Sequence, residues 1–283
     1  MDYFKLKKMY NSNSKFAKIT KALQKQPQFK LDQMLLEAIA EGDEFLFEFL
    51  LGCGASINAQ NKMGETALMY ACHYANLQIV QTLIDAGAAL NKTAKIAFSY
   101  QMDTSNPALT STLFGNNLKY SDAVSQRHRC SGVNALMYAA ASRMYADSLP
   151  VTKQLLQTGQ FNINQQDADG FSALMYAVEA GNVQVAQYLI ANGANVNTQD
   201  KYGNTAIMYA LNRMYSKFMV KLLVVNGADL KVKNKFGENA EDMAKRNQAR
   251  MGVKWLDQAK HFKELYKDRP TFLKVTPDEL ERE

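Results

Sequence analysis

One eight-residue pattern, here called the octad, occurs four times in this chain and constrains the fold more than any other feature. The copies read GETALMYA from Gly64, GVNALMYA from Gly132, GFSALMYA from Gly170 and GNTAIMYA from Gly203, and a weaker copy, GENAEDMA, starts at Gly237. Successive copies begin 68, 38, 33 and 34 residues apart. Periods of this length are typical of stacked supersecondary units, because each unit buries its apolar face only against a neighbour.

A second block follows most octads and completes the repeated unit. It reads LIDAGAALN at 83–91, LLQTGQFNIN at 155–164, LIANGANVN at 189–197 and LVVNGADLK at 223–231. The Thr, Ser or Asn of the octad can cap a short helix. A second helix with V-x-x-x-L-L/I spacing then ends at a glycine, which tolerates the left-handed backbone of a helix C-terminus. An extended N-x-x-D/N-x-x-G stretch leads to the next octad.

The combination of G-x-T-x-L-x-x-A with N-G-A-x-V-N at a period of 33 residues resembles the ankyrin repeat, and the TALMYA wording resembles bacterial members of that family. The resemblance implies an all-α solenoid of stacked helix-turn-helix units with projecting hairpin loops, about six repeats including caps. It also implies a protein-binding scaffold. The family's T-P-L-H becomes T/N/S-A-L/I-M, so the histidine that ties helix to hairpin is absent, and the sequence does not reveal a replacement.

The repeats predict three regions along the chain. Residues 1–30 form a basic helical extension, 31–266 form the ankyrin-repeat domain, and 267–283 form a C-terminal tail. The first unit, 31–62, has a less regular octad, which suits a terminal repeat that faces water on one side. The last unit places Glu241 where other octads have Leu or Ile, so we expect it to be a C-terminal cap.

Residues 94–130 break the regular period. About 35 residues are surplus there, and they form either an insertion between repeats two and three or a degenerate sixth repeat. An insertion is favoured because the block L-L-x-x-G-A is missing. Long loops are usually functional or disordered, and aromatic residues argue against simple disorder. We therefore expect partner contacts from Phe98, Tyr100, Phe114 and Tyr120.

The tips of the hairpins and the outward sides of the first helices form the predicted binding surface. Aromatic residues and methionine are enriched in interface cores, and several precede or follow the octad glycines. The candidate contacts there are Met63, Tyr74, Asp169, Phe171, Asp200, Tyr202 and Phe236.

Two Arg-Met-Tyr triplets lie where the turn between the helices is lengthened. Arg143 and Tyr145, and likewise Arg213 and Tyr215, are either partner contacts or turn packing. The octad tyrosines are expected to pack between adjacent repeats, and the octad methionines are expected in the core. The tyrosines are Tyr70, Tyr138, Tyr176 and Tyr209, and the methionines are Met69, Met137, Met175 and Met208.

Charge is unevenly distributed along the chain. The net charge is +6: residues 1–30 carry +7, 231–270 carry +5 and 271–283 carry −2, which leaves about −4 for 31–230. Solvated terminal helices explain the basic ends, so nucleic-acid binding is not favoured. The mildly acidic repeats suit a basic protein partner, such as a toxin or enzyme.

Motifs for catalysis are not found in this sequence. The three histidines and three cysteines form no CxxC or HExxH pattern, and neither GxSxG nor a P-loop occurs. His128 and Cys130 lie two residues apart, without an orienting group or an oxyanion site. We expect no enzyme activity, no cofactor and no metal.

The sequence also shows no pattern that predicts a membrane-spanning segment or a signal peptide. No apolar run reaches 18 residues, and the N-terminus lacks the apolar stretch of a signal peptide. We expect a cytoplasmic protein that is monomeric on its own. The preferred role is an inhibitor or immunity-type protein that neutralises a toxin by direct binding. The alternatives are a secreted bacterial effector that engages host proteins and a structural adaptor.

Overall fold

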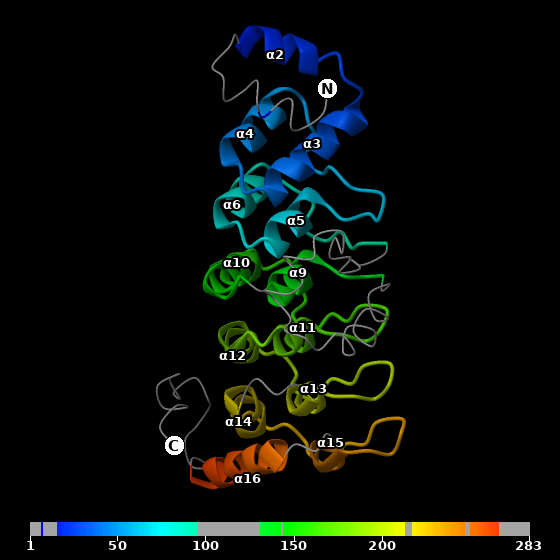
Figure 1. Ribbon diagram of the computed structural model, residues 1–283, viewed down its shortest axis with the longest axis vertical. Helices are drawn as coiled ribbons and strands as arrows, with labels where there is room; N and C mark the ends of the chain where they lie inside the picture. Colours follow the sequence, from blue (N-terminus) through cyan, green and yellow to red (C-terminus); the bar gives the residue numbers. More distant parts are fainter. Residues whose placement is uncertain are drawn as a thin grey trace.

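Paired helices in one elongated stack make up the fold. The computed structural model describes residues 7, 16–95, 131–142, 144–212, 217–246 and 250–265. Figure 1 shows two columns of helices, with hairpin loops projecting beside the first column. The described residues contain isolated β-bridges but no longer strand, so the predicted all-α ankyrin solenoid is confirmed.

Each repeat contributes its first helix to one column and its second helix to the other. After α2 (Phe16–Leu23), the first column holds α3 (Gln28–Ala40), α5 (Ala67–His73), α9 (Ala135–Ala141), α11 (Ala173–Ala180), α13 (Ala206–Asn212) and α15 (Ala240–Arg246). The second column holds α4 (Glu44–Gly52), α6 (Leu77–Asp85), α10 (Tyr145–Gln157), α12 (Val183–Ala191), α14 (Lys217–Val225) and α16 (Arg250–Leu265). None of these helices is long and apolar enough to cross a membrane.

Side-chain caps start the helices where the sequence predicts them. Thr66, Asn134 and Ser172 accept hydrogen bonds from the backbone N–H three residues later, at 3.2, 3.0 and 3.4 Å. In the second column, Asn76 and Asn182 cap α6 and α12 in the same way, each at 3.1 Å. Each cap satisfies an otherwise unpaired N–H and is worth about 1 kcal/mol.

Octad side chains form a continuous core through the stack. The Leu or Ile of each octad and the methionine that follows it are buried, which confirms the prediction for the methionines. These residues are Leu68, Met69, Leu136, Met137, Leu174, Met175, Ile207 and Met208. Burial of each such side chain contributes about 1.5–3 kcal/mol. Apolar contacts that recur in every repeat therefore stabilise the stack.

The last described repeat ends with a longer helix, α16. Leu256, Ala259 and Phe262 of α16 are buried, and α16 packs against α14. Glu241 replaces the octad's apolar residue and pairs with Lys260 Nζ at 2.5 Å. This hydrogen bond lowers the pKa of the Glu241 carboxyl. The Glu241 side chain is partly exposed, so the carboxylate keeps access to water as well as its pairing with Lys260.

Repeats two and three stack directly on each other despite the surplus residues between them. Helix α5 packs against α9, and α6 packs against α10. Ala94 N–H donates to Val133 O and Gly132 N–H donates to Ala94 O, both at 2.9 Å. The regular hairpins contain the same two bonds, for example Asp167 N–H to Phe171 O and Gly170 N–H to Asp167 O. We infer that 96–130 is inserted into a hairpin of otherwise ordinary register.

Candidate protein-binding surface

Hairpins between the repeats, here called fingers, form the candidate surface. They comprise residues 57–66, 91–95 with 131–134, 163–172, 196–205 and 230–239. Each finger has one turn position, which holds Asn61, Ala94, Asp167, Asp200 or Asn234. This position decides the shape of the tip, because its backbone N–H and C=O close the turn.

An Asp or Asn side chain clamps the backbone in four of the five fingers. Asp200 Oδ1 accepts from the N–H groups of Tyr202 and Asn204 at 2.9 and 2.8 Å. Asp167 accepts from Asp169 and Phe171 in the same way, both at 2.9 Å. Asn61 and Asn234 repeat this arrangement at 2.9–3.0 Å. Local bonds of this kind hold a turn without help from its neighbours.

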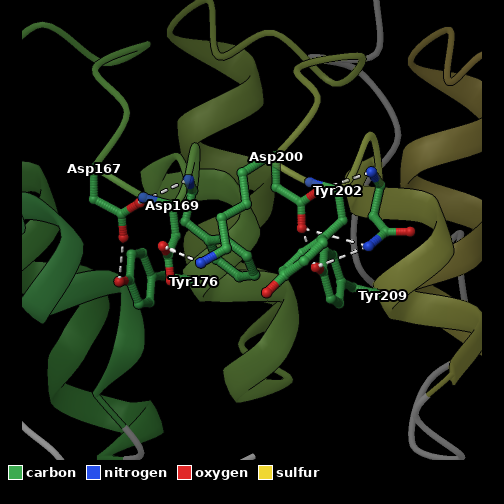
Figure 2. Close-up of polar contacts among 9 residues, drawn as sticks. Asp167, Asp169, Tyr176, Asp200, Tyr202 and Tyr209 are labelled. Atoms are coloured by element: carbon green, nitrogen blue, oxygen red, sulfur yellow. Dashed lines mark hydrogen bonds and ion pairs between the residues drawn. The ribbon is translucent and has the colours of Figure 1, made fainter. Parts of the chain in front are cut away.

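Tyrosines from the first helices tie the helices to the fingers. Tyr176 O–H donates to Asp167 Oδ2 at 2.6 Å, and Tyr209 O–H donates to Asp200 Oδ2 (Figure 2). In the second repeat Asn61 Nδ2 donates to Tyr70 Oη at 3.2 Å. Each tyrosine follows its turn residue by nine positions. These bonds replace the tie that the absent histidine provides in the family's usual pattern.

The second finger, which consists of 91–95 and 131–134, departs from this scheme because Ala94 has no polar side chain. Tyr138 of that repeat instead donates to Glu65 Oε1 of the preceding finger at 2.5 Å. Asn61 Nδ2 donates to the other oxygen of the Glu65 carboxyl at 2.6 Å. Glu65 is fully buried, and these two bonds are the kind of compensation that a buried carboxyl requires. Repeats two and three are thus joined by polar bonds at their shared boundary.

Backbone hydrogen bonds align the finger tips in one row. Lys95 N–H donates to Met63 O at 2.9 Å. Ala168 N–H donates to Ser131 O, and Lys201 N–H donates to Asp169 O. Lys235 N–H donates to Tyr202 O, and all three of these bonds are 2.8 Å long. We call these tips the fingertip row, consisting of Lys62, Met63, Lys95, Ser131, Ala168, Asp169, Lys201, Tyr202, Lys235 and Phe236. Backbone hydrogen bonds therefore link each finger tip to the next.

Glycine at the start of each octad permits this close alignment. A Cβ atom on Gly170 would lie 2.8 Å from both Asp200 Cα and Lys201 N of the next finger. Gly170 also has a φ of +81°, which favours glycine. Gly237 has a similar φ of +78°, but a Cβ atom there would meet no atom within 4 Å, since the last finger has no described neighbour beyond it.

Several predicted contact residues lie on accessible parts of this surface. Phe236 is 72% exposed and Tyr202 is 40% exposed, both at finger tips. Met63 and Asp169 are partly exposed in the same row, and Tyr74 is partly exposed at the end of α5. Their role in binding a partner stays a prediction.

Phe171 and Asp200 lie elsewhere than expected, because both side chains are buried. The Phe171 ring packs between the rings of Tyr176 and Tyr209, with centroid distances of 5.5 and 5.0 Å. It therefore fills the space between two repeats. The Asp200 carboxylate is used by its own finger and by Tyr209, so it fixes the tip and is not displayed on it.

Other predicted contacts fall outside the described residues. These are Phe98, Tyr100, Phe114, Tyr120, Arg143, Arg213 and Tyr215. Tyr145 begins α10, but its side chain is also outside the described part. Contacts from the insertion and from the Arg-Met-Tyr turns remain predictions.

Exposed lysines in the fingertip row were not among the predicted partner contacts, although three of them precede an octad glycine by two residues. Lys62, Lys95, Lys201 and Lys235 each follow the turn position of their finger, and all four are exposed. Lys201 Nζ pairs with Asp169 at 2.5 Å, which raises the pKa of Lys201, and lies 5.0 Å from the Tyr202 ring centroid. The four lysines recur at one position of the finger, and a net charge summed over 31–230 hides the three of them that lie in that range.

Two titratable groups of α5, Cys72 and His73, have shifted pKa values. Burial lowers the pKa of His73 to about 4 and raises the pKa of the Cys72 thiol. His73 is therefore neutral near pH 7, and its ring lies against those of Tyr74 and Tyr138. Among the described residues, no group of three His, Cys, Asp or Glu side chains could hold a metal.

Comparison with known proteins agrees with this architecture. The family described as "Ankyrin repeats (3 copies)" matches residues 35–147, 105–200 and 136–234. The putative ankyrin repeat protein YahD of Escherichia coli is 30% identical over 170 residues, which cover 56% of this chain and 79% of YahD. The ankyrin repeat, SAM and basic leucine zipper domain-containing protein 1 of Ornithorhynchus anatinus is 29% identical over 161 residues, or 57% of this chain. The match spans only 26% of that longer relative.

A solved structure extends the similarity over most of the stack. A chain in the structure of the Bd0816 predatory endopeptidase from Bdellovibrio bacteriovorus in complex with immunity protein Bd3460 has 25% sequence identity and a TM-score of 0.59. The alignment covers 79% of this chain and 96% of that one. With the repeats matched over more than half of its length, the chain belongs to the ankyrin-repeat family.

Proposed function

We propose that this protein is an inhibitor of immunity type, which neutralises a partner protein in the cytoplasm by binding it with its fingertip row and the adjoining faces of the first helices. Ankyrin repeats are protein-binding scaffolds, and the solved complex named above pairs an endopeptidase with an immunity protein. The observation that carries the proposal is the fingertip row itself. It is a continuous surface with apolar and charged side chains and is aligned by backbone bonds.

Rigidity of the fingers supports inhibition by binding alone. The Asp and Asn clamps and the tyrosine ties hold the tips before a partner arrives, so little conformational entropy is lost on association. A preorganised surface favours slow dissociation, and an inhibitor needs a long-lived complex to keep its target covered.

Affinity purification followed by an activity titration tests the proposal. The tagged chain is used to recover partners from the lysate of its own cells, and the recovered protein is identified by mass spectrometry. We expect a stoichiometric complex, and we expect the partner's activity to fall to its minimum at one equivalent of the chain. A complex in which the partner keeps full activity would contradict inhibition and favour the adaptor role.

The same titration examines the insertion. A variant that lacks residues 96–130 joins Lys95 to Ser131, which correspond to adjacent positions in the regular fingers. If the insertion supplies partner contacts, this variant binds the recovered partner more weakly than the intact chain. Unchanged affinity would remove the insertion from the proposed surface.

A further inference from the structure

We propose that the fingertip row binds an extended acidic segment of the partner protein, with a carboxylate at about every third residue and apolar side chains between. This inference rests on the proposed function, because it names the chemistry of the partner at the same surface. It reverses the expectation of a basic partner, since the exposed charges of the row are those of lysines.

Three of the four lysines are available for a partner's carboxylates. Lys62, Lys95 and Lys235 are exposed, and within the described part of the chain no carboxylate lies within ion-pair distance of them. Only Lys201 is paired, with Asp169 of the neighbouring finger. Complementary charge at such positions steers encounter and selects the partner.

An apolar side chain directly follows the lysine in three fingers. The pairs are Lys62-Met63, Lys201-Tyr202 and Lys235-Phe236. Phe236 is 72% exposed, although burial of a phenylalanine is normally favourable. Each of these tips therefore places a lysine beside an apolar surface, and at Lys62 and Lys235 the ammonium group is unpaired within the described residues, which suits a segment that carries carboxylates and apolar side chains together.

Finger spacing sets the spacing of the partner's carboxylates. The fingers extend from stacked helices, whose axes are typically about 8–10 Å apart. An extended chain rises about 3.3 Å per residue, so every third residue meets the next finger. The third tip has Ala168 and Asp169 in place of Lys and an apolar residue, so the row consists of two basic pairs with a break between them, and the segment needs no carboxylate opposite that tip.

Single-stranded nucleic acid matches this row less well. A nucleic-acid strand carries a phosphate at every nucleotide, so it also places negative charge opposite Asp169. A peptide segment can leave that position without a carboxylate. Protein carboxylates at wider intervals fit the observed charges better.

Fluorescence anisotropy with a defined probe tests the inference. The probe is a labelled peptide of about 15 residues, with Glu at every third position to match one finger, and Phe or Ser at the others. A peptide with Lys in place of Glu and an oligothymidine of similar length serve as comparisons. Binding is measured at about 0.05 M and about 0.3 M salt, between which charge screening increases strongly.

Two triple variants with equal change in net charge separate the row from general electrostatics. One variant carries Lys62→Glu, Lys95→Glu and Lys235→Glu. The control carries Lys25→Glu, Lys153→Glu and Lys254→Glu, at exposed lysines outside the fingers. Circular dichroism confirms that both variants are folded before binding is compared.

We expect the Glu peptide to bind the unaltered chain and to bind more weakly at the higher salt. The row variant should lose about tenfold or more in affinity, and the control should stay within about twofold. The inference is overturned if the unaltered chain does not bind the Glu peptide, if both variants lose affinity equally, or if the oligothymidine binds more tightly. If the row variant still inhibits the recovered partner fully, the row assignment fails while the proposed inhibition stands. If the peptide binds as expected but no partner is inhibited, the proposed function fails instead.

Discussion

The Tyr176 hydroxyl donates a 2.6 Å hydrogen bond to Asp167 Oδ2, and this bond joins the first helix of a repeat to the finger that precedes it. Asp167 Oδ1 meanwhile holds two N–H groups of the finger backbone. One carboxylate thus shapes the tip and attaches it to the helix column. The same arrangement recurs at Asp200 and Tyr209 (Figure 2).

Removal of the Tyr176 hydroxyl should destabilise the stack. We expect Tyr176→Phe to lower the free energy of unfolding by about 1–3 kcal/mol, because one oxygen of the buried Asp167 carboxyl loses its partner. The measurement is a urea unfolding curve followed by circular dichroism. Tyr188→Phe is the matched control, since no hydrogen bond is recorded for that hydroxyl among the described residues. Equal losses in the two variants would show that the tie contributes nothing.

Some features of the fold could be predicted from the sequence, and others could not. Octad leucines, methionines, caps and helix-ending glycines were predictable, because they obey local periodicity and capping chemistry. The tyrosine ties were not, since a bond between positions nine residues apart depends on how the finger folds back over the helix. The burial of Phe171 was missed for a similar reason. Its neighbour Tyr209 belongs to the next repeat.

The candidate surface was predictable only in part. Tyr202 and Phe236 were expected at the tips from their position before glycine, and both are exposed there. The lysines were left out of the predicted contacts because exposed charge depends on which side chains of a finger face outward, and Asp167 and Asp200 of the same fingers face inward. Asp167 and Asp200 count toward the net charge of the repeats, yet both are buried in the clamps.

Substitution of the octad glycines should reveal the packing between fingers. Both Gly170→Ala and Gly237→Ala place a side chain at positive φ, which costs about 1 kcal/mol. Only Gly170→Ala also forces a Cβ atom to within 2.8 Å of the next finger's backbone. We expect it to lose at least about 1 kcal/mol more, as overpacked sites typically do. Urea unfolding of both variants measures the difference, and equal losses would contradict close finger packing.

His73 should make the protein less stable in mild acid. Its pKa is lowered to about 4 in the folded protein by burial, from about 6.5 in the unfolded chain. The unfolded state therefore binds more protons as pH falls from about 6.5 to about 4, and stability is lost across that window. The full effect is at most about 3.5 kcal/mol, since each pKa unit corresponds to about 1.4 kcal/mol.

Unfolding at several pH values isolates this contribution. The urea midpoints of the original chain and of His73→Gln are compared at pH values on either side of that window. Carboxyl groups titrate in both proteins, so only the difference between the two pH dependences reports on His73. A slope that is unchanged in His73→Gln would exclude the histidine as the source.

Deletion of residues 96–130 should leave the solenoid folded. Lys95 and Ser131 occupy positions that are consecutive in the regular fingers, and the hydrogen bonds of Ala94, Gly132 and Val133 already close the turn. We expect the helical circular dichroism per residue to rise slightly and the unfolding midpoint to stay equal or increase, because a long loop closure is removed. Loss of cooperative unfolding would instead show that the segment supports the stack.

Phe236 and Phe171 should respond in opposite ways to substitution, although both lie next to an octad glycine. Phe236 is 72% exposed at the last tip, so Phe236→Ala should change the free energy of unfolding by less than about 0.5 kcal/mol. Phe171 packs between Tyr176 and Tyr209, so Phe171→Ala should cost about 3–5 kcal/mol. Affinity for the partner recovered in the purification experiment should show the reverse ranking, once folded protein is compared at equal concentration. An exposed aromatic ring that contributes neither stability nor affinity would remove Phe236 from the proposed surface. A small stability loss in Phe171→Ala would mean that neighbouring side chains refill the space between the two repeats.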